Sequence, residues 1–164
     1  MRRLALVAAL SLLAACSEPT PLELSQKADA SLRAGNYDQA RKEAEDGLKA
    51  TEGQDTPRNV LWTLERVRIE ALASGGHLAD VLTSLTRLDA PYEDLLTADF
   101  YAKLGTELAQ AGDSLEALEL VELGKQKFPE MAAAFDGLVE DIKKKAEASD
   151  DPELTAKLKQ LGYL

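Results

Sequence analysis

YAKLGTELAQAGDSLEALELVELGKQKFP, residues 101–129, is the most regular segment of this chain. On both sides of its central AGDS, apolar residues recur every three or four positions, which is the spacing of amphipathic helices. Gly112 permits a tight turn between the two helices, and Pro129 ends the second because proline cannot continue a helix. The segment therefore predicts two antiparallel helices joined by a short turn.

Small and large residues also follow a fixed order in this segment. The order is carried by Tyr101, Leu104, Gly105, Leu108, Ala117, Val121, Gly124 and Pro129. Their spacing resembles that of the tetratricopeptide repeat, in which W-x2-L-G-x2-Y in one helix is followed by A-x3-F in the next. The resemblance implies that Gly105 and Ala117 are small because two helices cross closely there.

Two earlier segments share the turn of this helical pair. The three turns are AGNYDQA (34–40), GGHLADV (75–81) and AGDSLEA (111–117). Their glycines Gly35, Gly76 and Gly112 are 41 and 36 residues apart, and Ala40 holds the position of Ala117. Paired helices repeated at this interval stack to bury their apolar faces. We expect an all-α fold, a helical-hairpin solenoid of about three tetratricopeptide-like repeats over residues 22–149 that includes a C-terminal capping helix.

The first two units depart from the repeat pattern. Lys27 in the first and Arg68 in the second stand where leucine is usual. The second unit still carries a clear helix start, because Pro57 suits the first position of a helix over residues 57–73 and Thr56 can cap it. We therefore interpret the second unit as a degenerate repeat.

The chain continues beyond the third unit with two further predicted helices. The apolar spacing of residues 135–142 predicts an amphipathic helix that caps the array. Asp151 as the cap and Pro152 as the first residue then begin a short helix within residues 150–164. We expect this last helix to fold back on the capping helix.

The N-terminus has the features of an export signal. Residues 1–15 hold two arginines, a short apolar run and small residues, and they end directly before Cys16. The LAAC at residues 13–16 resembles a bacterial lipobox, which implies that Cys16 is lipidated and that residues 1–15 are removed. Residues 16–21 then form a lipidated tether. Because the residue after the cysteine is Ser17 rather than aspartate, the resemblance points to the outer membrane, on its periplasmic face.

Composition narrows the possible partners. Loss of Arg2 and Arg3 with the leader reduces the basic residues from 19 to 17 against 29 acidic ones, so the formal charge changes from −10 to −12. A surface this acidic repels nucleic acid, and we expect none to bind. Cys16 is the only cysteine, so no disulfide can form within the chain. Apart from the lipid on Cys16, no cofactor is expected.

Catalytic chemistry is nearly absent from the sequence. His77 is the only histidine, and it falls in a predicted turn, so we expect no metal site and no histidine-based catalytic pair. GDSL at residues 112–115 matches the short motif of the GDSL esterases, in which the serine is the nucleophile. In that family the motif follows a strand and the histidine comes late in the chain. A hydrolase using Ser114 is therefore the weaker alternative, and we expect no enzyme.

The resemblance to tetratricopeptide repeats implies a groove, lined by the first helix of each pair, that binds a protein or peptide. Projecting the repeat onto this chain gives the lining Asp29, Leu32, Arg33, Arg66, Glu70, Asp99, Ala102, Thr106 and Ala109. We expect an adaptor at the outer membrane that holds an envelope protein. The alternatives are a pilotin or an outer-membrane assembly factor, and a spacer that associates with itself.

Overall fold

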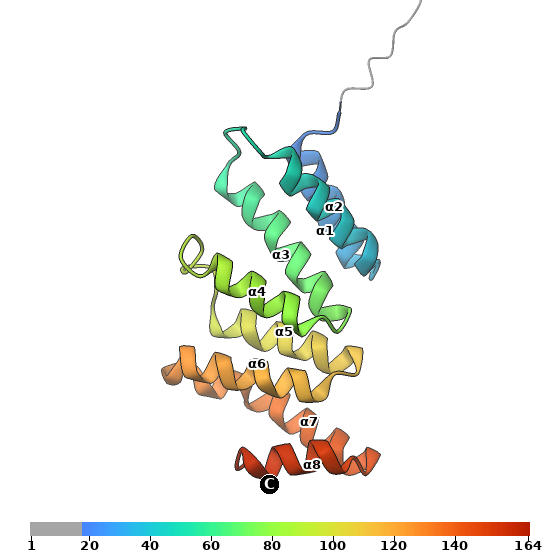
Figure 1. Cartoon of the computed structure of the whole chain (residues 1–164), viewed down its shortest axis with the longest axis vertical. Coiled ribbons are helices and arrows are strands. Elements are labelled where there is room, and N and C mark those ends of the chain that lie inside the picture. Colours follow the sequence, from blue (N-terminus) through green and yellow to red (C-terminus); the bar gives the residue numbers. More distant parts are fainter. Residues whose placement is uncertain (1–17) are drawn as a thin grey trace, which may run out of the picture.

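The computed structural model describes residues 18–164, and every regular element in that range is a helix, as the all-α prediction expects (Figure 1). The elements are α1 (Pro21–Arg33), α2 (Tyr37–Ala50), α3 (Arg58–Ser74), α4 (Leu78–Leu88), α5 (Ala98–Ala111), α6 (Ser114–Lys127), the 3-10 helix η1 (Pro129–Phe135), α7 (Asp136–Ser149) and α8 (Pro152–Gln160). The predictions for residues 1–17, lipidation of Cys16 among them, lie outside the described residues. Within residues 18–164, no helix combines the length and the apolar character needed to cross a bilayer.

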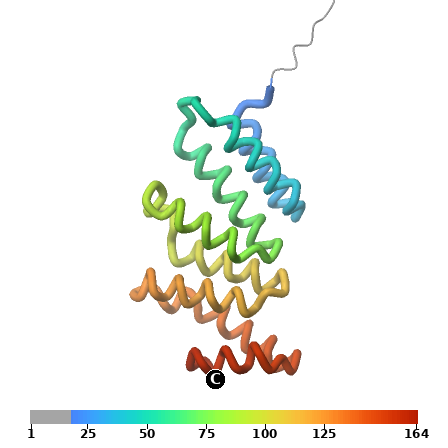
Figure 2. Tube along the Cα trace, in the orientation of Figure 1, coloured from blue at the N-terminus to red at the C-terminus, as the bar shows by residue number. Residues whose placement is uncertain are grey.

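The helices follow one another along the long axis of the molecule, from α1 at one end to α8 at the other (Figure 2). Most helices pack on the elements before and after them in the chain, α4 and α5 being an exception, and α3 also packs on α1 and on α5. Trp62, early in α3, contacts Phe100, early in α5, and Glu70, late in α3, contacts Lys103 one turn further along α5. The two helices therefore run in the same direction.

Side-chain oxygens cap the N-termini of α1, α5 and α8. The Asp151 carboxylate accepts hydrogen bonds from the backbone N–H groups of Glu153 and Leu154, so the predicted cap of α8 is confirmed. The predicted cap of α3 is wrong, because α3 begins at Arg58 and the residue before it is Pro57 rather than Thr56. Pro57 has an extended backbone (ψ 138°), so it precedes the first turn instead of belonging to it.

The buried core lies on two sides of α3. One side joins α1 and α2 through small side chains and a few larger ones: Ala28, Ala40, Ala44, Val60, Leu64, Val67 and Ala71. The other side, with Ile69 and Leu72, belongs to a larger core that runs through α4 to α8 and contains Tyr101, Leu104, Leu108 and Ala117. Helix α3 is thus the element that connects the first helical pair to the rest of the molecule.

Glycines mark the turns and the closest helix contacts. Gly35, Gly76 and Gly112 have positive φ angles of 75°, 74° and 112°, a backbone region that favours glycine, and each follows the first helix of a pair. A Cβ added to Gly105 would lie 2.7 Å from Leu138 Cδ2 in α7 and 3.7 Å from the Ala117 carbonyl oxygen in α6. The tightest approach at Gly105 is therefore made by α7, beyond the paired helix. Pro129 follows the end of α6 and opens η1.

In the first two helical pairs, charged residues occupy the positions at which the third pair has leucine, and they form ion pairs there. Lys27 lies 3.0 Å from the buried carboxylate of Glu43 in α2. The Arg68 guanidinium donates to Glu65 at 3.2 Å and to Ser84 of α4 at 3.0 Å. Polar contacts thus join the two helices within each of these pairs, at the positions where the third pair has leucine.

Candidate functional site

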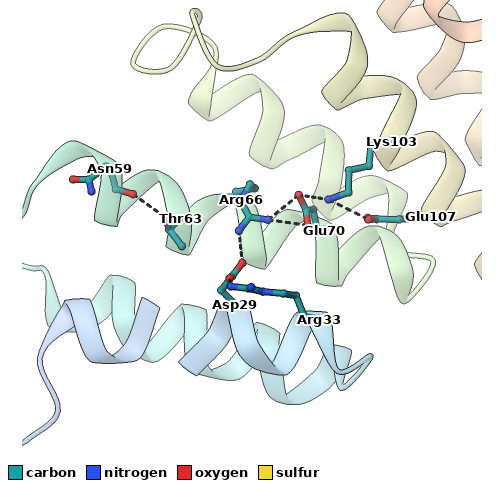
Figure 3. Close-up of polar contacts among 8 residues, drawn as sticks. All are labelled: Asp29, Arg33, Asn59, Thr63, Arg66, Glu70, Lys103 and Glu107. Carbon is teal, nitrogen blue, oxygen red and sulfur yellow. Dashed lines mark hydrogen bonds and ion pairs between the residues drawn. The ribbon is translucent and has the colours of Figure 1, made fainter. Parts of the chain in front are cut away.

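Charged side chains of α1, α3 and α5 meet in one surface depression of about 410 Å³. We call it the ionic groove. Its lining is Asp29, Leu32, Arg33, Tyr37, Arg66, Glu70, Lys103 and Glu107. Acidic and basic groups alternate across it from α1 to α5, and Figure 3 shows the contacts among them.

At the α1 side of the ionic groove, one carboxylate joins two helices. Asp29 accepts hydrogen bonds from Arg33, one turn further along α1, and from Arg66 of α3 at 2.5 Å. Burial acts to raise the pKa of Asp29, but the bonds from Arg66 and Arg33 outweigh it and hold that pKa below its ordinary value. Asp29 therefore stays ionised at neutral pH and ties α1 to α3.

In the middle of the ionic groove, Glu70 is buried with only 2% of its side chain exposed. Arg66 Nη1 lies 3.1 Å from both of its carboxylate oxygens. Lys103 Nζ reaches the same carboxylate from α5 at 2.7 Å. Two cations from two helices therefore compensate one buried charge, which is the condition under which such a charge is tolerated.

At the α5 side of the ionic groove, the carboxyl group of Glu107 makes fewer polar contacts than that of Glu70. Its Oε1 atom is 3.9 Å from Lys103 Nζ, and its Oε2 atom is buried with no hydrogen-bond partner within residues 18–164. Burial, assisted by the negative charge of Glu70, raises the pKa of Glu107 to about 8, while Lys103 and Arg66 act in the opposite direction. Glu107 is therefore largely protonated at neutral pH.

An aromatic cluster lies at the beginning of the same α3–α5 seam. The Trp62 ring centre is 5.3 Å from that of Tyr92 and 5.6 Å from that of Phe100. The Arg58 guanidinium lies 5.3 Å from the centre of the Tyr92 ring and also pairs with Asp94. Trp62 is partly buried against the larger core, so it both fills the seam and contributes to its surface.

No family model, curated protein or solved structure matches this chain. Its function is therefore inferred from buried ion pairs, from one carboxyl group with a buried oxygen that has no hydrogen-bond partner in the described part of the chain, and from an aromatic cluster. Within residues 18–164, no three His, Cys, Asp or Glu side chains come together in a way that could hold a metal ion. The groups of the ionic groove are suited to binding and orienting another molecule.

The structure brings five of the nine predicted lining residues together. Asp29, Leu32, Arg33, Arg66 and Glu70 all line the ionic groove. The four predicted residues of α5 do not line it. Asp99 is exposed, Ala102 packs against the larger core, and Thr106 and Ala109 line a separate depression of about 160 Å³ beside α7.

Two lining residues, Lys103 and Glu107, were missed by the projection. They stand four residues apart on α5, as Arg66 and Glu70 do on α3, so each pair occupies one helix face. The matching spacing was a signal in the sequence. What the repeat pattern could not give was the rotation of α5, which depends on its packing against η1 and α7 as well as on α3 and α6.

Ser114 does not have the surroundings of a nucleophile. Its Oγ atom is buried and has no hydrogen-bond partner within the described part of the chain. His77 is exposed just before α4, and no hydrogen bond joins its ring to Ser114 Oγ. A serine nucleophile needs a base within hydrogen-bond reach and access to substrate.

Proposed function

We propose that this chain is a lipid-anchored adaptor of the cell envelope, with a tetratricopeptide-like array whose ionic groove binds a protein or peptide. The observation that carries the proposal is that α1, α3 and α5, each the first helix of a successive pair, all contribute side chains to this one groove. The positive-φ turn glycines of the three pairs are consistent with such an array. In repeat proteins of stacked helical pairs, surfaces of this kind are used for binding.

The polar character of the ionic groove suits a partner that binds through charge. Its ion pairs already fix Arg66, Glu70 and Lys103 in position, so little side-chain freedom is lost when a partner binds. Leu32 and Tyr37 add apolar surface at the edge. Such a lining selects its partner by the arrangement of charges more than by apolar area.

The membrane anchor follows from the lipobox-like residues before Cys16. Helix α1 begins at Pro21, and a capping box closes its start: Glu23 N–H donates to Thr20 Oγ1, and Thr20 N–H donates to the Glu23 carboxylate at 2.8 Å. Residues 16–20 can span at most about 18 Å. An acyl chain on Cys16 would therefore hold the folded part close to the outer membrane on the periplasmic side.

The test is to crosslink the tagged, lipidated protein in its native membrane, purify it and identify the bound proteins by mass spectrometry. Arg66→Gln removes the cation that Asp29 and Glu70 share, and Lys42→Gln on the exposed side of α2 is the matched control. We expect one dominant partner that is lost with Arg66→Gln and kept with Lys42→Gln. Circular dichroism checks that both variants fold.

Two other outcomes would contradict the proposal in different ways. A partner list that does not change in Arg66→Gln would place binding outside the ionic groove. Recovery of this protein alone, in wild type and variants, would favour a spacer that associates with itself.

A further inference from the structure

The ionic groove contains one carboxyl group whose hydrogen bonding is incomplete. Lys103 Nζ lies 2.7 Å from Glu70 but 3.9 Å from Glu107, which is beyond hydrogen-bond distance. Lys103 therefore pairs with Glu70, and Glu107 Oε2 has no hydrogen-bond partner within residues 18–164. A buried polar atom without a partner costs free energy, so a donor that reaches Glu107 would gain what the free protein lacks.

The charges that line the groove determine which kind of ligand group can bind there. A carboxylate or phosphate would face Asp29, Glu70 and Glu107, while the three cations of the groove already contact those acids. An apolar group would leave Glu107 Oε2 unsatisfied. A cation with N–H donors, an ammonium or a guanidinium group, both supplies the missing bond and compensates the charge of an ionised Glu107.

Size and net charge agree with this choice. The depression of about 410 Å³ is large enough to receive one long side chain. With a formal charge of −12 after loss of the two leader arginines, the chain attracts basic segments over a distance.

We propose that the partner segment places a lysine or arginine side chain in the ionic groove, where its N–H groups donate to the Glu107 carboxylate. This inference rests on the proposed function, because it assumes that the groove binds a peptide segment. It adds the chemical class of the residue that the groove selects.

Binding of a cation at Glu107 is coupled to loss of a proton. The titratable and charged groups that line the groove with Glu107 are Asp29, Arg33, Tyr37, Arg66, Glu70 and Lys103, and of these Glu70, Lys103 and Arg66 act on its charge. With its pKa raised to about 8, Glu107 is protonated before the cation arrives, and the cation binds the ionised form. Affinity therefore rises with pH up to about 8 and then levels off, since a ligand lysine stays charged to about pH 10.

The experiment selects binders from a display library of random short peptides, using the full lipidated chain in detergent. Wild type is compared with Glu107→Gln, which keeps the shape of the side chain, and with Glu119→Gln on the exposed side of α6 as the matched control. We expect lysine or arginine to be enriched at one peptide position with wild type and with Glu119→Gln. We expect no such enrichment with Glu107→Gln.

The best wild-type peptide then gives a quantitative readout. Replacing its basic residue by norleucine should weaken binding at least about tenfold at pH 8, and wild-type affinity should rise about tenfold or more from pH 6 to pH 8. With Glu107→Gln, affinity should not vary with pH over this range.

Each contrary result has a distinct meaning. Selected peptides without a basic preference, or a preference that persists in Glu107→Gln, would overturn the cation site and leave the groove as a peptide site. If no peptide is selected by any of the three proteins, the proposed peptide-binding function fails, and the cation site fails with it.

Discussion

Two helical glycines differ in what surrounds them. A Cβ on Gly124 of α6 would run into the Phe135 ring, which is fully buried and has no flexible end that could move aside. A Cβ on Gly137 of α7 would meet nothing within 4 Å. The same substitution should therefore have opposite effects on stability at the two positions.

We predict that Gly124→Ala lowers the free energy of unfolding by about 1 to 3 kcal/mol, because it overpacks the contact with Phe135. Gly137→Ala should raise it by up to about 1 kcal/mol, because alanine favours a helix more than glycine does. Urea titrations followed by circular dichroism measure both values. A Gly124→Ala protein as stable as wild type, or more stable, would show that the contact between Gly124 and Phe135 is not as tight as described.

Glu107 should make stability depend on pH. Its pKa is raised from 4.5 to about 8 by folding, so between these values the folded chain holds a proton that the unfolded chain has lost. The stability due to this proton is complete below about pH 4.5 and is lost as pH rises through 8. The free energy of unfolding should fall over this window by up to about 1.4 kcal/mol per pH unit.

Glu107→Gln has no proton to lose, so the difference in unfolding free energy between wild type and this variant should decline steadily from about pH 5 to pH 8. Taking the difference removes the effect of the other carboxyl groups. Parallel curves for the two proteins would mean that Glu107 is ionised and well solvated in the folded chain.

The first helical pair should be the least stable element. Its contact with α3 rests largely on the alanines Ala28, Ala40 and Ala44, whereas the core around α5 and α6 contains Leu104 and Leu118. Buried alanine removes less apolar surface from water than buried leucine does, so less free energy holds α1 and α2 in place.

Native-state hydrogen exchange measures this difference directly. We predict that backbone amides in α1 and α2 exchange through openings at least about 1 kcal/mol lower in free energy than those of α5. Equal opening free energies across α1, α2 and α5 would show that the chain unfolds as a single unit.

Element positions were largely predictable from local sequence, while their rotations were not. The predicted helix over residues 57–73 is observed as α3, one residue later in the chain. Proline, glycine and apolar spacing act locally, and so they locate helices well. Lys103 and Glu107 were missed because the face that α5 turns to the ionic groove depends on its contacts with η1 and α7. These two elements lie outside the repeat pattern, so the pattern carries no information on that rotation.

At the scale of the whole molecule, the proposed anchor at Cys16 determines where the ionic groove works. We predict that the wild-type protein incorporates an alkyne-labelled fatty acid in cells and fractionates with the outer membrane. Cys16→Ala should lose both properties, because Cys16 is the only cysteine in the sequence and so the only thiol that can carry a lipid. Membrane association of Cys16→Ala without label would contradict a lipid anchor at this residue.

The central claim is that the ionic groove binds the partner, and site-specific photocrosslinking in cells tests it most directly. A benzophenone amino acid replaces either Arg33, which lines the groove and has 78% of its side chain exposed, or Glu45 on the exposed side of α2. We predict a discrete adduct with one envelope protein from position 33 and none from position 45. An adduct from position 45, with none from position 33, would contradict the claim.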